Sequence, residues 1–109
     1  MQISTTWCVV GNFNFIRRLG ERISVNTNMD YSREMRRFND FIEKTKLFDI
    51  LMMGRKFTWY KSNGMVKSII DRILVSWECL DKWPNSKQVV LGRSVSDHCA
   101  LVLKTNSTD

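Results

Sequence analysis

Short runs of apolar residues, separated by polar turns, indicate that most of this chain forms strands. The first run covers residues 5–10 and is dense in Thr, Trp, Cys and Val. It stops at the polar, turn-forming cluster of residues 11–14, so we expect a buried strand that ends in a polar loop. Residues 17–29, rich in Asn, Ser and Gly, are predicted to form a further loop.

One substantial helix is predicted over residues 30–46. Asp30 or Ser32 can cap its start, because short polar side chains accept hydrogen bonds from the first backbone N–H groups of a helix. Five residues recur at helical spacing and form a mainly apolar stripe: Met35, Phe38, Phe41, Ile42 and Thr45. The pattern predicts a helix that lays one face on the core. We interpret the aromatic members of the stripe as packing residues rather than as a ligand site.

The second half of the chain begins with a predicted hairpin. Residues 57–60 are strand-like, and residues 61–64 end in Asn-Gly, a pair that readily takes the positive φ angles of a tight turn. Residues 65–75 provide the returning strand. Asp71 and Arg72 interrupt its apolar end, and two charges in a core strand need partners.

The remaining elements are short. A helical turn is predicted over residues 77–83, ahead of Pro84, and brief strands over residues 89–91 and 100–103. Short strands combined with one substantial helix favour an α+β fold of the α/β sandwich type.

Length and composition fit one small domain. The chain has 109 residues, of which 43% are hydrophobic, with 4 Trp and 6 Phe, so a core can form. No apolar run is long enough to span a bilayer, and the N-terminus does not read as a signal peptide. We therefore expect a soluble, intracellular protein of the nucleus or cytoplasm that is neither secreted nor membrane-bound. Residues 1–104 are assigned to the domain and residues 105–109 to a disordered tail.

The net charge and the cysteine spacing exclude few classes of ligand. The net charge is +6, and 13 of the 17 Lys and Arg residues fall between Arg17 and Arg72. These charges suit a polyanion such as nucleic acid, or simply solvated surfaces, and charge alone does not decide between the two. Cys8, Cys79 and Cys99 lack the paired spacing of a structural zinc site. We expect them to be buried thiols in a reducing compartment.

The residues best suited to chemistry lie in polar clusters at strand ends. Asp97 offers a carboxylate for a metal ion or phosphate site, and the adjacent His98 offers a general base or hydrogen-bond donor. Asp71 could hold the imidazole in one tautomer. A histidine ahead of an apolar strand is more often a capping or core residue, so the Asp97–His98 pair does not by itself identify a catalytic site.

Four segments in order carry a more specific pattern. Residues 7–14 read WCVVGNFN, residues 54–60 GRKFTWY, residues 70–76 IDRILVS and residues 95–102 VSDHCALV. Together they resemble the WxxxGDFN, GxxFTW, (L/I)DR and SDHxPL segments of the endonuclease/exonuclease/phosphatase superfamily. The GxxFTW form, together with residues 80–84 (LDKWP), is typical of the version found in plant LINE-type retrotransposons.

This resemblance implies a fold and a reaction. The chain would be the C-terminal half of a two-sheet, helix-flanked domain that hydrolyses phosphodiester bonds, usually in DNA, with Mg²⁺ as cofactor. His98 would be the imidazole that stabilises developing charge, and Asp71 would orient it. Asp97 would sit at the metal or phosphate, and Asn14 would hydrogen-bond the scissile phosphate.

The resemblance also implies contacts with DNA, the expected partner. Thr58 and Trp59 match the part of the family that contacts the DNA backbone and minor groove, although core packing explains Trp59 equally well. Arg55 and Lys56 are the expected phosphate contacts. No small-molecule cofactor is expected, and the oligomeric state is left open.

Two departures from the family pattern argue against activity. Position 12 carries Asn where the family has Asp, and an amide cannot accept the proton of an attacking water. Losing one charged member of a catalytic group typically costs roughly 10³-fold or more. The N-terminal half, with its metal-binding Glu, is missing, so Mg²⁺ binding by this fragment is left open. Apart from Asp71 and Asp97, the carboxylates stand in helix or loop contexts suited to solvent.

We therefore expect a truncated, retroelement-derived endonuclease-like domain that is inactive on its own. One alternative is a weak, non-catalytic nucleic-acid-binding module. Another is a residual metal-dependent nuclease or phosphatase that uses Asp97 and His98. Because half of a two-sheet core would expose apolar surface, we also predict poor stability or aggregation unless the chain binds a partner.

Overall fold

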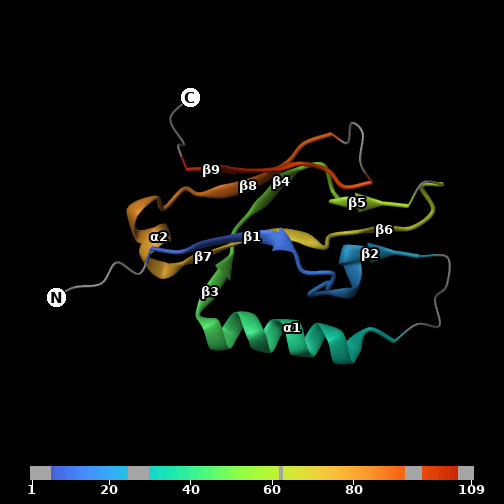
Figure 1. Ribbon diagram of the computed structural model, residues 1–109, viewed down its shortest axis with the longest axis horizontal. Helices are drawn as coiled ribbons and strands as arrows, with labels where there is room; N and C mark the ends of the chain where they lie inside the picture. The colour runs from blue at the N-terminus through green and yellow to red at the C-terminus, as the bar shows by residue number, and fades with distance from the viewer. Residues whose placement is uncertain (1–5, 25–29, 62, 93–96, 106–109) are drawn as a thin grey trace.

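The computed structural model describes residues 6–24, 30–61, 63–92 and 97–105, and these form an α+β fold (Figure 1). The elements in chain order are β1 (Cys8–Asn12), η1 (Leu19–Glu21), β2 (Arg22–Ile23), α1 (Ser32–Thr45), β3 (Leu47–Asp49), β4 (Met52–Gly54), β5 (Trp59–Tyr60), β6 (Lys67–Ser68), β7 (Asp71–Ser76), α2 (Trp77–Lys82), β8 (Lys87–Val90) and β9 (Leu101–Lys104). In this part of the chain the strands form three small sheets, ordered β1-β7-β3, β2-β6-β5 and β4-β8-β9. The expected α+β class is confirmed at this level.

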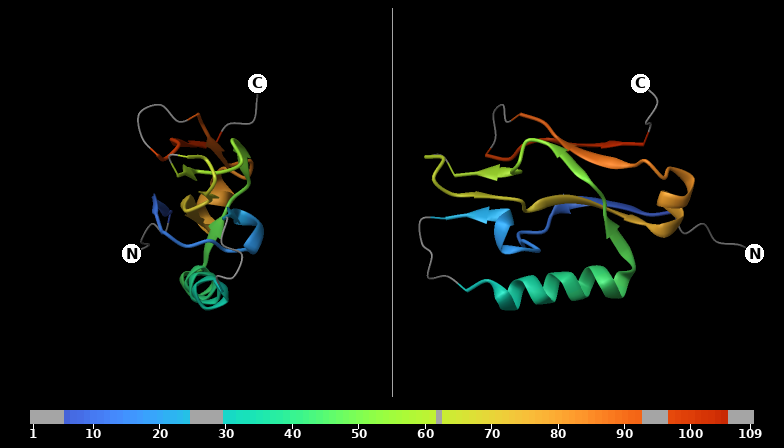
Figure 2. Two further views of the ribbon diagram at one scale, coloured as in Figure 1. Left: turned by 90° about the vertical axis from the view of Figure 1, so that its right-hand side faces the viewer. Right: turned by 180° about the vertical axis from the view of Figure 1, so that it is seen from behind.

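Strand β7 is the centre of the molecule and is buried on both sides. Its Ile73 and Val75 pack with Ile50 and Cys79, and β9 covers this cluster. On the opposite side, Leu74 packs with residues of α1. Figures 1 and 2 show the resulting layers, with α1 on one side of the β1-β7-β3 sheet and β4, β8 and β9 on the other. A strand covered on both faces is a continuous apolar run, which explains the apolar end predicted for this segment.

The predicted helix is confirmed as α1, but its N-cap is Tyr31, without a side-chain cap bond, rather than Asp30 or Ser32. Phe38 and Ile42 of its apolar stripe are buried, whereas Phe41 is 44% exposed. The Asp30 carboxylate accepts a hydrogen bond from the backbone N–H of Ser32 at 2.9 Å, and hydrogen bonding to Ser32 lowers the pKa of Asp30. The helix ends at Lys46, which takes a left-handed backbone conformation with φ of 56°.

The hairpin is also confirmed, but the long returning strand is wrong. Strands β5 and β6 pair antiparallel, and Gly64 in the turn has the expected positive φ of 74°. The segment of residues 65–75 then divides into β6 and β7, which belong to different sheets. The chain changes sheet where the Thr58 hydroxyl accepts hydrogen bonds from the backbone N–H groups of Ile70 and Asp71.

Several short elements depart from the expected positions. Residues 17–29 were expected to be loop, yet they contain η1 and β2, and β2 pairs with β6. Strands β3 and β4 are not predicted by the pattern at all, because each has only three residues and depends on pairing with β7 or β8. The last two predicted strands are present as β8 and β9, shifted by one or two residues. Residues 5, 25–29, 62, 95–96 and 106–109 of the predicted segments lie outside the described residues.

Apolar side chains remain exposed on the surface of a flat molecule that measures 52 × 34 × 19 Å. They include Trp7 and Trp77 at 61% exposure and Val10 at 59%. Exposed apolar surface on this scale is consistent with the predicted tendency to aggregate, which stays a prediction. No helix in the described residues is long and apolar enough to cross a membrane.

Gly54 is expected to be the glycine least tolerant of substitution. It has a φ of +90°, and a Cβ atom there would lie 2.3 Å from the carbonyl oxygen of Val90 in the paired strand β8. The strained backbone alone costs about 1–3 kcal/mol for a non-glycine residue, and the clash with the backbone adds to this. We expect Gly54→Ala to lower the urea midpoint of unfolding clearly. Gly20→Ala, where a Cβ has open space, is the control; equal midpoints for the two variants would contradict this view.

Candidate active site

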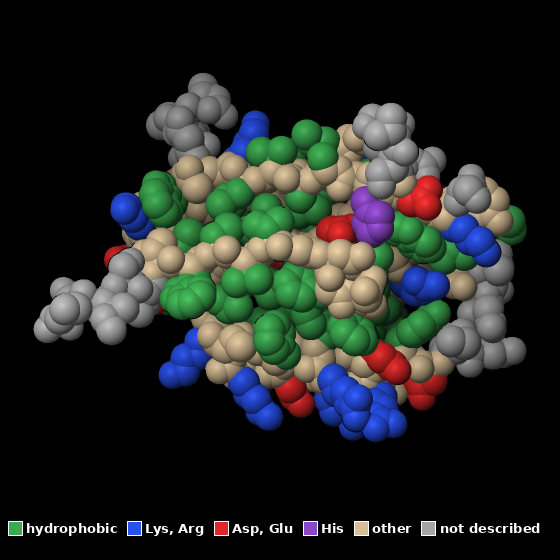
Figure 3. Space-filling view, in the orientation of Figure 1, with side chains coloured by type: hydrophobic (Ala, Val, Ile, Leu, Met, Phe, Trp, Pro, Cys, Tyr) green, Lys and Arg blue, Asp and Glu red, His purple; other side chains and the backbone are tan. Residues whose placement is uncertain are grey.

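The candidate site is built around a hydrogen bond between Asp71 and His98. Nδ1 of His98 lies 2.7 Å from Oδ2 of Asp71, although the two residues are 27 positions apart. The Asp71 side chain is 16% exposed and that of His98 35% exposed, so the pair lies at the surface end of a buried strand. The histidine, purple in Figure 3, lies on the same face as a large apolar area. The predicted contact between these residues is therefore present, while its catalytic role stays a prediction.

Two backbone hydrogen bonds hold the segment around His98 against β5. The N–H of Tyr60 donates to the carbonyl of Asp97 at 3.0 Å, and the N–H of Cys99 donates to the carbonyl of Thr58 at 2.7 Å. Between them, Trp59 and His98 form an isolated antiparallel bridge. The segment ahead of β9 is thus fixed to β5, and β5 is fixed to the start of β7.

Asn12 completes the arrangement from β1. It is paired in register with Asp71, and both line a hollow of about 200 Å³. The Asn12 side-chain oxygen accepts the backbone N–H of Asn14 at 2.8 Å, and this bond shapes the turn in which Asn14 takes a φ of 60°. The residues that line the hollow come from β1, from β7, from the chain ahead of β9 and from β9 itself: Val10, Gly11, Asn12, Asp71, Arg72, Cys99 and Leu101.

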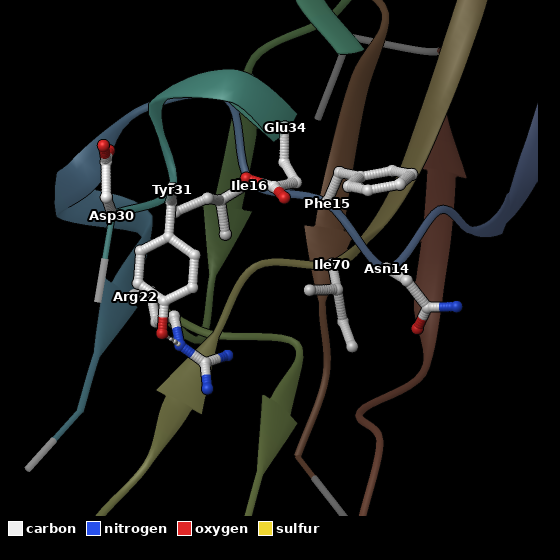
Figure 4. Close-up of a pocket in the computed structure, with 8 residues that line it drawn as sticks. All are labelled: Asn14, Phe15, Ile16, Arg22, Asp30, Tyr31, Glu34 and Ile70. Atoms are coloured by element: carbon white, nitrogen blue, oxygen red, sulfur yellow. Dashed lines mark hydrogen bonds between the residues drawn. The ribbon is translucent and has the colours of Figure 1, made fainter. Parts of the chain in front are cut away.

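Asn14 does not line this hollow but a neighbouring one. Figure 4 shows it at the rim of a hollow of about 220 Å³, close to Phe15 and Ile70. On the other side of that hollow, Arg22 donates from Nε to the Tyr31 hydroxyl at 3.0 Å. The structure therefore groups Asn12, Asp71 and His98 and leaves Asn14 next to the group.

The described residues do not supply a complete site for Mg²⁺. Among them, no three His, Cys, Asp or Glu side chains are grouped so as to hold a metal ion. Asp97 is exposed, and Asp71 is hydrogen-bonded to His98. A divalent cation needs several oxygen ligands, so the residues present do not fit the cofactor that the sequence resemblance implies, and we route no chemical step through it.

Of the four predicted DNA contacts, Thr58 is wrong. Its side chain is completely buried, and its hydroxyl serves the backbone of β7 instead. Trp59 is half-buried beside His98. Arg55 and Lys56 are exposed in the chain that follows β4, outside the lining of the hollow, and the Lys56 ammonium lies 5.7 Å from the ring centre of Phe57. The roles of these three residues stay predictions.

A buried cluster of charges was missed by the sequence reasoning. The Arg72 guanidinium is 2% exposed; it forms an ion pair with Glu21 and a second one, of 2.7 Å, with Asp49. Arg17 also contacts Asp49 at 3.2 Å. The expectation that carboxylates other than Asp71 and Asp97 face solvent is therefore wrong for Glu21 and Asp49. A signal existed for Asp49, because it interrupts an otherwise apolar run of residues 47–53.

The cysteine prediction holds for two of three residues. Cys79 and Cys99 are buried, but Cys8 is exposed because it lies on β1, at the edge of its sheet. Partial burial of its thiol, with a smaller contribution from Cys79, raises the pKa of Cys8. This thiol is therefore less ionised at neutral pH than a fully solvated one.

Comparison with known proteins adds no relative. The chain matches no protein-family model, no curated protein and no solved structure.

Proposed function

We propose that the chain carries the phosphate-contacting part of a phosphodiesterase-type site, derived from a Mg²⁺-dependent DNA-cleaving enzyme of a retroelement and inactive on its own. The hydrogen bond between His98 and Asp71 is the observation that supports this most. It places an oriented imidazole next to a hollow whose rim carries Asn12. An imidazole held by a carboxylate is suited to bind or protonate a phosphate oxygen.

The orientation of the ring defines what His98 can do. With Nδ1 directed to Asp71, the ring turns Nε2 away from that carboxylate. If Nδ1 carries the proton, Nε2 can accept a proton from water; in the imidazolium form it can donate to a phosphate oxygen. The Asp71 oxygen bonds Nδ1 and so fixes the orientation of the ring.

Asn12 explains why activity is expected to be low. Its side-chain oxygen already accepts the N–H of Asn14, and the remaining NH₂ group can only donate. A carboxylate at this position could keep the same turn with one oxygen and offer the other to an attacking water. The amide thus preserves the local shape while it removes the basic group.

The first test is nicking of supercoiled plasmid by the purified chain, with Mg²⁺ or with EDTA, beside His98→Ala. We expect the same background rate in all arms, because the basic group at position 12 is absent and the described residues do not form a metal site. Nicking that requires both Mg²⁺ and His98 would contradict this and favour the residual-nuclease alternative.

Phosphate contact is tested separately by NMR. On titration with a short DNA duplex, the imidazole signals of His98 are expected to shift, and added salt is expected to reverse the shift. Asp71→Asn should reduce the response because an amide holds Nδ1 of His98 less firmly than a carboxylate does. Unchanged His98 signals at saturating DNA would contradict a role of this residue in phosphate contact.

A second candidate function, non-catalytic binding of nucleic acid, is favoured by the exposed Arg55 and Lys56 and by the net charge of +6. The same titration separates the two functions. If this candidate is correct, Arg55→Gln together with Lys56→Gln should weaken salt-sensitive binding, whereas His98→Ala should leave it unchanged.

A further inference from the structure

Strand β1 presents an open edge of its sheet. The sheet order is β1-β7-β3, so β1 has one strand neighbour in the described part of the chain. The N–H of Phe13 donates to the carbonyl of Ile70, and the N–H of Ser76 donates to the carbonyl of Trp7, so the odd-numbered residues of this segment hydrogen-bond to β7. The pairing alternates in an antiparallel ladder, so the backbone groups of the even-numbered residues point away from β7.

This edge carries none of the features that usually protect an edge strand. Residues 1–16 contain no charged side chain, and the first charge in the chain is Arg17. The register with β7 is continuous from Cys8 to Asn12, with no bulge, and no proline is present. Val10 at its centre is 59% exposed. Natural edge strands normally use charge, proline or bulges to prevent pairing with another chain, so this edge is a template for pairing.

We propose that β1 pairs antiparallel with β1 of a second copy of this chain, around a two-fold axis at Val10. In this register Val10 lies opposite its own equivalent, Cys8 lies opposite Asn12 of the other copy, and the outward N–H and C=O groups of all three residues are paired. The two three-stranded sheets become one six-stranded sheet. The interface is isologous, so the association closes at the dimer.

The side chains fit this register on the face toward α1. Trp7 of one copy lies opposite Phe13 of the other, and Val9 lies opposite Gly11, so that large residues meet aromatic or small ones. Trp7 is 61% exposed in the single chain and borders an apolar groove of about 470 Å³ between β1 and α1. Pairing would cover this groove and extend the interface beyond the strand itself.

The charge distribution favours a second copy as the occupant. Two copies with a charge of +6 repel each other unless they meet where the charges are absent. Figure 3 shows Lys and Arg side chains around the borders of the molecule, with several along the lower border over α1, while the centre of the face that contains β1 is mainly apolar. The left view of Figure 2 shows β1 at one outer side of the molecule, with α1 below it.

Sedimentation velocity of the full chain at micromolar concentration is the first test. The wild-type chain is expected to sediment as a dimer, and Val10→Lys is expected to raise the dissociation constant at least about tenfold, because two lysines then face each other across the axis. Leu19→Lys is the matched control, since Leu19 is 66% exposed but lies on η1. Circular dichroism checks that both variants are folded. A monomeric wild type, or a dimer or larger assembly that Val10→Lys leaves intact, would overturn the proposal.

A cross-link tests the register. In Asn12→Cys, the new thiol lies opposite Cys8 of the other copy, at a Cα separation of about 5.5 Å, which a disulfide can bridge. Dissolved O₂, with copper phenanthroline as catalyst, accepts two electrons and two protons from each thiol pair, so two disulfides are expected to lock the dimer. Cys8 and residue 12 of one strand are about 13 Å apart and cannot pair. A dimer that shows no cross-link in this variant would overturn the two-fold register.

Discussion

Arg72→Ala is expected to destabilise the fold by about 3–5 kcal/mol, a large share of the about 5–15 kcal/mol by which an ordinary domain is stable. The Arg72 guanidinium is 2% exposed and neutralises two carboxylates, Glu21 and Asp49, whose side chains are 10% and 8% exposed. Truncation to alanine removes the positive charge of Arg72, so both mostly buried carboxylates lose a cation that neutralises them. The guanidinium also lies 5.4 Å from the ring centre of Phe38, so the packing against α1 is lost as well.

A matched control is available on the same carboxylate. Arg18 also contacts Glu21, at 3.4 Å, but its own side chain is 70% exposed. Exposed ion pairs contribute about 0–1 kcal/mol, so Arg18→Ala should change stability little. Urea unfolding followed by tryptophan fluorescence compares the two variants. If Arg72→Ala and Arg18→Ala lose similar amounts, the buried cluster does not stabilise the fold as described.

The Arg72 cluster also shows how much of the interior the sequence can predict. Two charges within an apolar strand indicate that partners must exist, and the structure supplies them for both Asp71 and Arg72. The sequence could not name Glu21, because it stands in a segment that reads as loop and reaches Arg72 only through tertiary packing. Local patterns carry information about neighbours along the chain, whereas ion pairs between distant segments depend on the complete topology.

The same limit explains which strands could be predicted. Strand β7 and helix α1 have long apolar patterns, and both are found. Strands β3 and β4 have three residues each, and the side chain of Gln88 bridges the end of β3 to β7. Its side chain accepts the N–H of Ile73 at 2.8 Å and donates to Asp49 at 2.8 Å. Such a side-chain bridge has no signature in the apolar pattern.

In the candidate site, by contrast, a contact between distant segments could be predicted. Asp71 and His98 could be paired from the sequence because the order of the motifs resembles a known family, not because their spacing implies contact. The same resemblance assigned Thr58 to DNA, and there the structure gives a different role. Carry-over from a motif therefore identifies which residues gather near a site, while burial decides which of them can meet a ligand.

Thr58→Val is expected to cost about 2–6 kcal/mol, because it leaves two backbone N–H groups without an acceptor, at about 1–3 kcal/mol each. The Thr58 hydroxyl accepts from Ile70 at 3.0 Å and from Asp71 at 3.1 Å. Valine has nearly the same shape but no oxygen, so the loss is in hydrogen bonding rather than in packing. Thr58→Ser keeps the hydroxyl, and Thr45→Val, at an exposed helical position, is a control for the type of substitution.

Thr58→Val should also disturb the hydrogen bond between Asp71 and His98 in the candidate site. Thr58 binds the N–H of Asp71 through its hydroxyl and the N–H of Cys99 through its carbonyl, so it joins the two segments that carry the Asp71–His98 pair. In Thr58→Val, the start of β7 is released, and the 2.7 Å hydrogen bond is expected to lengthen. The proton on Nδ1 of His98 should then lose its downfield NMR shift under conditions where the chain is still folded, and Thr58→Ser should restore it. A destabilised Thr58→Val with an unchanged Nδ1 proton would show that Thr58 supports the core alone, and that the histidine is oriented by its bridge to Trp59.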